Sequence, residues 1–153
     1  MSINSVLIFC AGFGTRMGEI TKVTPKPMVP ILNKPLIDYA IDISLNANIQ
    51  NIVVNLHYLP EQIEDHLAKF KKIKIIREIP TILETGGGLK NALPILGEEP
   101  VITLNSDTVW IGNNPIKSLL KAWDPQEMDA LLMLIQTENA QAYQKTGDFY
   151  LDN

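Results

Sequence analysis

One glycine-rich segment and two basic side chains near the N-terminus could together bind a polyphosphate. Residues 11–16 read Ala-Gly-Phe-Gly-Thr-Arg, and Lys26 follows between two prolines. Glycine lets the main chain approach a ligand closely, so this phosphate loop (residues 11–16) can direct several N–H groups at one anion. Arg16 adds a planar cationic fork, and the prolines stiffen the backbone around Lys26. This combination predicts a polyphosphate site.

Two common phosphate motifs do not fit this segment. A Walker A loop needs a lysine directly after its second glycine, where this chain has Thr15. The dinucleotide fingerprint needs a third glycine where this chain has Met17, and an acid at the end of the second strand, where the chain reads Val-Asn-Leu. Both mismatches argue against a dinucleotide-dependent oxidoreductase. Taken alone, the loop could also be an ordinary strand-to-helix turn.

A carboxylate further along the chain could hold the metal ion that accompanies a polyphosphate. Asp107 follows the apolar run at residues 101–104, which we expect to be a strand. Proteins hold Mg²⁺ through one or two carboxylates together with substrate phosphates. An aspartate in this place could instead cap a helix or a turn. Because the phosphate loop and Lys26 are expected beside Asp107, we favour the metal site.

A second glycine-rich segment could bind a nucleobase. Residues 84–88 read Glu-Thr-Gly-Gly-Gly and follow the expected third strand. Because the glycines carry no side chains, a flat base could lie against the backbone, and Thr85 adds a hydroxyl. The alternative is a flexible turn that leads into a helix.

Strand and helix patterns alternate along the chain, and this order must position the segments above. Short apolar runs predict strands at residues 6–9, 52–54, 74–77, 101–104 and 130–136. Apolar residues at helical spacing predict helices near residues 35–47, 60–70, 86–96 and 115–123. This alternation predicts an α/β fold, three layers thick, with a mostly parallel sheet. Ligands of such sheets bind at the carboxyl ends of the strands, where the phosphate loop and Asp107 fall.

The phosphate loop followed by Thr-Pro-Lys-Pro resembles the signature of the sugar-1-phosphate nucleotidyltransferases, or nucleotide-sugar pyrophosphorylases. The resemblance implies a single Rossmann-like nucleotidyltransferase domain over residues 1–153. It implies that an NTP and a sugar 1-phosphate react to give an NDP-sugar and pyrophosphate, with Mg²⁺ as cofactor. The Glu-Thr-Gly-Gly-Gly segment is similar to that of uridylyltransferases acting on N-acetylmuramate 1-phosphate, which make a cell-wall precursor. Mannose-1-phosphate guanylyltransferase-like proteins have related loops.

The resemblance also implies roles for individual residues. The expected catalytic residues are Arg16, Lys26 and Asp107, of which Asp107 holds the metal; Ser106 stands where the family often has glycine. The expected nucleotide-binding residues are Ala11, Gly12, Phe13, Gly14, Thr15, Arg16, Lys26, Glu84, Thr85, Gly86 and Gly87. Asn105 and Gly147 are expected at the sugar phosphate.

The family continues past the length of this chain, and that continuation carries a second metal-binding aspartate. We therefore expect the C-terminal part of the fold to be missing here, with no residue assigned to the second carboxylate. A module that binds nucleotides or nucleotide sugars without catalysis remains an alternative.

Composition argues against several other classes of protein. The 153 residues carry a net charge of −4, which gives no basic footprint for nucleic acid. The single cysteine, Cys10, allows no internal disulfide and is expected to pack in the core. No apolar run approaches the length of a membrane span, and no signal peptide is recognisable, so we expect a cytoplasmic protein. The base, the sugar and the oligomeric state stay open.

Overall fold

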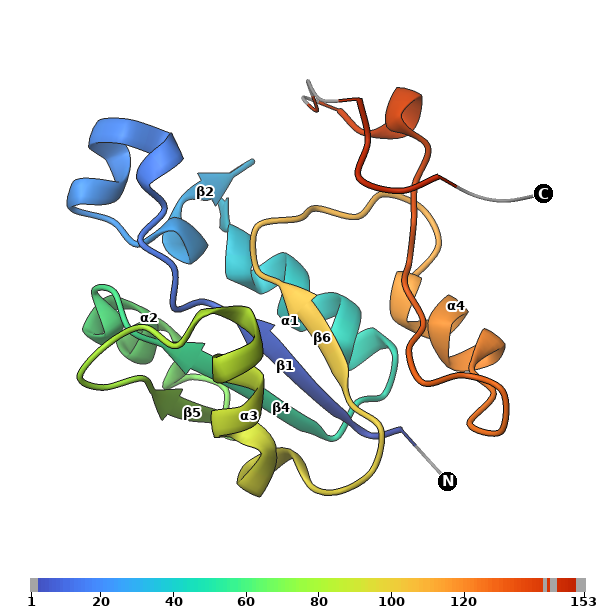
Figure 1. Ribbon diagram of the computed structural model, residues 1–153. Coiled ribbons are helices and arrows are strands. Elements are labelled where there is room, and N and C mark those ends of the chain that lie inside the picture. Colours follow the sequence, from blue (N-terminus) through green and yellow to red (C-terminus); the bar gives the residue numbers. More distant parts are fainter. Residues whose placement is uncertain (1–2, 142, 144–145, 151–153) are drawn as a thin grey trace.

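A four-stranded parallel sheet forms the centre of the computed structural model, which describes residues 3–141, 143 and 146–150 (Figure 1). Its strands are β1 (Ser5–Phe9), β4 (Asn51–Leu56), β5 (Ile73–Arg77) and β6 (Ile102–Asn105), in the spatial order β5-β4-β1-β6. All three neighbouring pairs are parallel. The two central strands contain the apolar runs at residues 6–9 and 52–54, as expected for strands that are covered on both faces.

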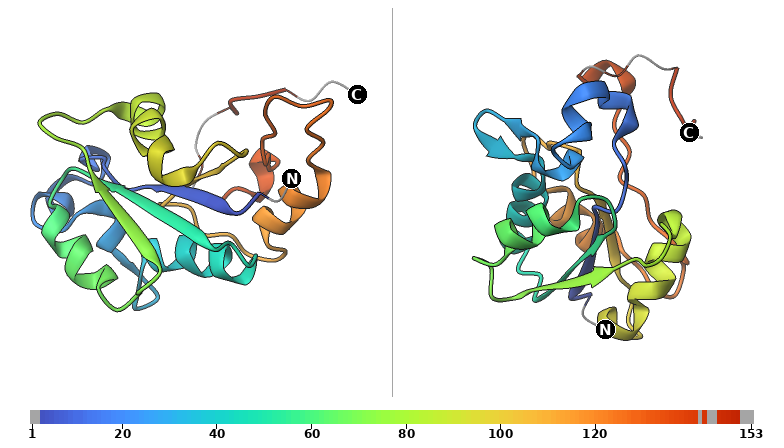
Figure 2. Two further views of the ribbon diagram at one scale, coloured as in Figure 1. Left: turned by 90° about the horizontal axis from the view of Figure 1, so that it is seen from below. Right: turned by 90° about the vertical axis from the view of Figure 1, so that its left-hand side faces the viewer.

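Helices cover both faces of the sheet. Side chains of α1 (Leu36–Asn46), α2 (Pro60–Leu67) and α4 (Pro115–Ala122) pack with Val6 and Ile8 of β1. Leu7, which points to the other face, packs with α3 (Glu84–Leu96). Figure 2 shows α3 on one side of the sheet and α1 and α2 on the other. The predicted three-layer α/β architecture is confirmed.

The four predicted helices are present with small shifts of their ends. Proline occupies the first helical position of α2 and α4, where its missing N–H group leaves no hydrogen bond unmade. The Asn114 side chain caps α4 by accepting hydrogen bonds from the backbone N–H groups of Ile116 (2.9 Å) and Lys117 (3.2 Å). The start of α3 lies two residues before the expected one, at Glu84. The described helices include none that is both long and apolar enough to span a bilayer.

The strand predicted at residues 130–136 is wrong. This segment pairs with no strand among the residues that the structure describes. Residues 102–105 of β6 and residues 129–133 both line a cavity of about 560 Å³. Leu132 and Ile135 are 60% and 53% exposed. The apolar run of this segment suits a strand, but a strand also needs a neighbouring backbone to satisfy its N–H and C=O groups.

Several short elements follow the strand β1. Two 3₁₀ helices, η1 (Thr15–Lys22) and η2 (Lys26–Met28), lead into an antiparallel hairpin of β2 (Pro30–Ile31) and β3 (Lys34–Pro35). A third, η3 (Thr137–Asn139), lies near the C-terminus. The sequence patterns did not predict these elements, because two-residue strands and single turns leave no periodicity to detect.

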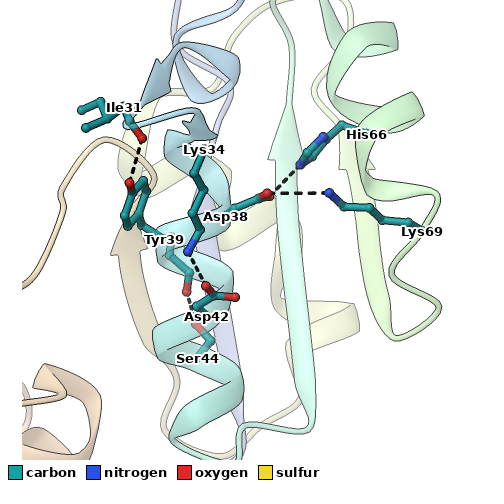
Figure 3. Close-up of polar contacts among 9 residues, drawn as sticks. Ile31, Lys34, Asp38, Tyr39, Asp42, Ser44, His66 and Lys69 are labelled. Atoms are coloured by element: carbon teal, nitrogen blue, oxygen red, sulfur yellow. Dashed lines mark hydrogen bonds and ion pairs between the residues drawn. The ribbon is translucent and has the colours of Figure 1, made fainter.

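Side chains of α1 hold the hairpin and α2 in place (Figure 3). The Tyr39 hydroxyl donates to the Ile31 carbonyl (2.8 Å), and the Lys34 ammonium pairs with the Asp42 carboxylate. On the other side of the helix, Asp38 Oδ1 lies 2.6 Å from His66 Nε2 of α2. Because η2 directly precedes the hairpin, these contacts also anchor the turn that carries Lys26.

Candidate functional site

The carboxyl ends of β1, β4 and β6 meet at a cavity of about 500 Å³. The phosphate loop, the η2 turn, the start of α3 and the turn after β6 form its walls. Most of the residues expected at the site line this one cavity: Ala11, Gly12, Phe13, Gly14, Thr15, Arg16, Lys26, Glu84, Thr85, Asn105 and Asp107.

Three expected residues are not among those that line the cavity. Gly86 and Gly87 lie in the first turn of α3, directly after Thr85. Gly147 belongs to the C-terminal segment, where a Cβ at its position would lie 3.5 Å from Thr137 Cγ2. Their assignments to the base and the sugar phosphate stay predictions.

Gly14 brings the phosphate loop directly against Lys26. Its φ of +67° lies in the left-handed region, and an added Cβ would lie 2.9 Å from both Lys26 Cβ and Thr21 Cγ2. Only glycine fits such a contact without displacing a neighbour. The Gly14 carbonyl accepts from the Met17 N–H (2.9 Å) and from the Thr21 hydroxyl (3.0 Å). The loop therefore turns into η1 while packing on the segment that carries the lysine.

Aromatic side chains from the loop between β4 and α2 support the phosphate loop from outside. The Phe13 ring lies edge-on to the His57 ring, with 5.6 Å between centroids, and 5.4 Å from the Tyr58 ring. The Tyr58 hydroxyl donates to the Thr21 carbonyl (2.9 Å) in η1. His57 does not line the cavity, so its ring is a supporting group here.

Lys26 and Asp107 form an ion pair inside the cavity, although 81 residues separate them in the chain. Their side chains are 29% and 36% exposed. The Ser106 hydroxyl donates to the Phe9 carbonyl (2.7 Å), which fixes the turn carrying Asp107 against the end of β1. A serine can make this bond where a glycine cannot. The pair places a cation and an anion together at the cavity wall.

Cys10 is a core residue, as expected, although it also lines the cavity. Its thiol is buried, and its backbone N–H donates to Asn55 Oδ1 (2.9 Å). Burial raises the pKa of the thiol to about 12, and the nearby Asp107 charge adds to the rise, while a hydrogen bond with Ser106 opposes it. A thiol with this pKa is not a nucleophile at neutral pH.

Sequence reasoning missed Glu78, a buried carboxylate beside the cavity. It follows β5 directly and accepts a hydrogen bond from Asn55 Nδ2 (2.7 Å) at the end of β4. Its backbone N–H donates to the Leu56 carbonyl (2.7 Å). An acid at the carboxyl end of a predicted strand, next to an asparagine that ends the neighbouring strand, is the signal that could have indicated it.

The donors that face the cavity suit a hard cation only when a ligand adds further oxygens. Within the described part of the chain, no group of three or more His, Cys, Asp and Glu side chains could hold a metal ion. Asp107 offers one carboxylate at the cavity wall. One carboxylate together with phosphate oxygens is a donor set that fits Mg²⁺.

Comparisons with known proteins agree with this geometry. The profile of the MobA-like NTP transferase domain matches residues 6–143. The chain is 39% identical over 153 residues to the N-acetylmuramate alpha-1-phosphate uridylyltransferase of Caulobacter vibrioides, covering 95% of this chain and 63% of that protein. It is 34% identical over 143 residues to the mannose-1-phosphate guanyltransferase of Hypocrea jecorina, covering 90% of this chain and 39% of that protein. The chain thus spans only part of the length of these curated relatives.

Solved structures share the same fold. HddC from Yersinia pseudotuberculosis, crystallised with GMP-PN, matches with a TM-score of 0.62 and 32% identity over 70% of this chain and 49% of that one. A UDP-glucose pyrophosphorylase complexed with UDP-glucose matches with a TM-score of 0.68 over 78% of this chain and 53% of that one. At 24% identity, this second likeness bears on the fold alone. Together with the parallel sheet, these matches confirm the Rossmann-like nucleotidyltransferase fold.

Proposed function

The chain belongs to the MobA-like NTP transferase domain family, and from this premise we propose that it transfers a nucleoside monophosphate from an NTP to a sugar 1-phosphate. The products are an NDP-sugar and pyrophosphate. UTP is the favoured donor and N-acetylmuramate 1-phosphate the favoured acceptor, because a uridylyltransferase of that specificity is 39% identical to this chain. The observation that carries the proposal is the single cavity at which the phosphate loop, Lys26 and Asp107 converge.

The triphosphate lies along the phosphate loop in this proposal. Backbone N–H groups of residues 12–15 and the Arg16 guanidinium bind the β- and γ-phosphates, because both kinds of donor suit phosphate oxygens. Lys26 leaves its ion pair and neutralises charge near the α-phosphate. Gly14 supports this arrangement, since its contact with Lys26 Cβ keeps the lysine beside the loop.

The nucleobase lies at the start of α3. Thr85 and Glu84 both line the cavity, and they are followed by the exposed backbone of Gly86 and the half-buried backbone of Gly87. Backbone and hydroxyl groups there can pair with the edge of a base. Asn105 at the end of β6 and Gly147 are the candidates for contact with the sugar 1-phosphate.

The reaction is an in-line displacement at the α-phosphorus. An oxygen of the sugar 1-phosphate forms the new bond to phosphorus, the bond to the bridging oxygen of the β-phosphate breaks, and pyrophosphate leaves with that electron pair. The attacking oxygen is already ionised at neutral pH, so the step needs no general base. The residues act by holding the two substrates in line and by compensating phosphate charge.

Asp107 is the residue that would hold Mg²⁺. When bound, this ion supplies a positive charge that neutralises phosphate oxygens. The exposed fraction of the Asp107 carboxylate and its place in the cavity wall support the assignment. A protein that handles nucleoside triphosphates and carries a single reduced cysteine suits the cytoplasm.

Two alternatives have observations in their favour. Transfer of guanylate to mannose 1-phosphate is supported by the likeness to a guanyltransferase and by a related structure solved with a guanine nucleotide analogue. Binding without turnover is supported because the described residues contain no group of three or more potential metal ligands, which leaves Asp107 as the one carboxylate that we assign to a metal.

Pyrophosphate release tests the proposal. The protein is incubated with Mg²⁺ and each of UTP, GTP, CTP and dTTP, together with N-acetylmuramate, mannose or glucose 1-phosphate. We expect release that requires both substrates and is fastest with UTP and N-acetylmuramate 1-phosphate. Fastest release with GTP and mannose 1-phosphate would establish the guanylyltransferase alternative. Calorimetric binding of nucleotide without pyrophosphate release would establish the binding module.

Lys26→Ala serves as the variant for this assay, and Lys22→Ala is its control. The loss of one charge-assisted contact should weaken UTP binding by about 1.5–3 kcal/mol, roughly 10- to 150-fold in Kd. Lys22 lies in the adjacent η1 helix, pairs with Glu19 on the surface and does not line the cavity, so its removal should leave the affinity unchanged. Equal affinities of the two variants would show that Lys26 does not contact the nucleotide.

A further inference from the structure

A chain of hydrogen bonds through two buried side chains joins the two glycine-rich segments. The Cys10 N–H, directly before the phosphate loop, donates to Asn55 Oδ1 (2.9 Å), and Asn55 Nδ2 donates to Glu78 Oε1 (2.7 Å). The Leu83 N–H, directly before the segment assigned to the base, donates to Glu78 Oε2 (2.7 Å). Asn55 and Glu78 are 2% and 1% exposed, so water has little access to the bond between their side chains.

The chemistry of the donors allows one arrangement of this network. Backbone N–H groups can only donate, so Cys10 must face the oxygen of the Asn55 amide, and the amide nitrogen must then face Glu78. Leu83 also brings an N–H group. Both oxygens at position 78 therefore have to accept, and a carboxylate is the side chain that does so.

The network is held tightly between three elements. A Cβ at Gly88 of α3 would lie 2.7 Å from Glu78 Oε1 and 2.8 Å from Asn55 Nδ2, so the helix backbone rests directly on the pair. His57 Nδ1 lies 2.7 Å from the Glu78 carbonyl oxygen. Glu78 thus sits where β4, β5 and α3 meet, and a shift of its carboxylate would move the start of α3.

We infer that Glu78 is a positioning residue that sets the start of α3 at a fixed distance from the phosphate loop through Asn55. The inference rests on the proposed function, in which these two segments bind the base and the phosphates of one nucleotide. A ribose of fixed length links base and phosphates, so both segments can bind them together only at one spacing. Glu78 itself contacts neither part.

A swap of chemistry between positions 55 and 78 tests the inference. Glu78→Gln turns an amide N–H towards one of the two donors, and Asn55→Asp brings two carboxylates together. In Asn55→Asp/Glu78→Gln, the new amide at position 78 donates to the new carboxylate at position 55 and accepts from Leu83. All three contacts are then kept, with the bond between positions 55 and 78 reversed in direction and the negative charge at position 55 in place of position 78. This double variant should therefore restore what each single variant loses.

Calorimetry measures the affinities for UTP and for inorganic tripolyphosphate, which lacks a base and a ribose. We expect Glu78→Gln to lose about tenfold or more in UTP affinity, while its tripolyphosphate affinity changes by less than about twofold. Asn55→Asp also adds a negative charge at a side chain that lines the cavity, so it should weaken the binding of both ligands. The double variant should return the ratio of the two affinities to the wild-type value. Asn51→Asp is the matched control. Asn51 begins β4, the strand that also carries Asn55, and lies at the end of β4 away from the cavity, where its side chain bonds to Ser5 and Ile95.

The control should lower the midpoint of thermal unfolding without changing the affinity ratio. If Glu78→Gln lowers only that midpoint and leaves the ratio unchanged, Glu78 is merely structural and the inference is overturned. If Glu78→Gln does not fold, the double variant provides the test. A folded double variant whose ratio of UTP affinity to tripolyphosphate affinity is below that of the wild type also overturns the inference. A wild-type protein that binds neither UTP nor GTP better than tripolyphosphate would overturn the base assignment, and with it both the proposed function and this inference.

Discussion

The ion pair between Lys26 and Asp107 determines what the cavity can accept. Each charge compensates the other at the cavity wall, and both side chains are partly exposed. A phosphate alone can replace only the carboxylate as the partner of Lys26. A phosphate with a divalent cation can replace both partners, because the cation takes the place of the ammonium beside Asp107. The two residues thus favour a nucleotide and a metal ion that arrive together.

Cys10 provides a test of burial at the same wall, because it is the chain's single cysteine. Since burial raises the pKa of its thiol from 9.0 to about 12, the thiolate fraction at pH 8 should be about a thousandfold lower in the folded protein than in the unfolded chain. We expect Ellman's reagent to react at least that much more slowly with native protein than with protein in guanidinium chloride. Similar rates would show that the thiol is accessible.

The same pKa predicts how stability depends on alkaline pH. The unfolded thiol ionises first, so the contribution of the protonated thiol is fully present below about pH 9 and is lost as the pH rises towards 12. Cys10→Ala should show a flatter decline of the unfolding free energy over that range. Urea titrations at intervals of one pH unit measure it.

At the scale of the elements, Gly14 is the residue through which the phosphate loop packs on η2. Gly14→Ala should lower the free energy of unfolding by roughly 1–2 kcal/mol from its positive φ, and by more from the contacts with Lys26 and Thr21. It should also weaken UTP binding, because the lysine must move. Urea unfolding and calorimetry measure the two effects.

Gly12→Ala is the control for this substitution. Nothing lies within 4 Å of a Cβ at Gly12, so its unfolding free energy should stay within about 0.5 kcal/mol of the wild type. Equal destabilisation by both substitutions would contradict the role of the contact between Gly14 and Lys26.

The helices and central strands could be predicted from the sequence because each has a local cause. Pro60 and Pro115 begin helices, and the apolar run of β1 is long enough for a buried strand. The strand at residues 130–136 could not be decided locally, since its existence depends on a partner elsewhere in the chain. Glu78 was missed for a similar reason: its role depends on Asn55 and Leu83, which only the parallel sheet and α3 bring to it.

For the whole molecule, we expect Mg²⁺ to bind with nucleotide and only weakly alone. At a concentration of UTP with Mg²⁺ about 100 times the Kd, binding should stabilise the fold by about 2.7 kcal/mol, which raises the Tm of a chain of this size by about 5–10 °C. Mg²⁺ alone should leave the Tm unchanged. Differential scanning calorimetry with each ligand, alone and together, measures this coupling.

In Asp107→Asn, the rise in Tm with UTP should be smaller than in the wild type and should no longer depend on Mg²⁺. If the Tm of the wild type rose with Mg²⁺ alone as much as with Mg²⁺ and UTP together, the chain would supply a complete coordination shell. That result would contradict the single carboxylate assigned here.

The close approach of Gly88 to Glu78 and Asn55 limits how this sequence can change in evolution. Three glycines stand in a row, but they face different obstacles. A Cβ would find open space at Gly86, the Leu83 side chain at 3.0 Å at Gly87, and two polar atoms under 3.0 Å at Gly88. Packing alone therefore leaves the first position free to change, restricts the second and requires glycine at the third, whereas a base bound against the first position would also require glycine there. Over long divergence, glycine should persist at position 88 because of packing, and at position 86 only in relatives that bind a base there.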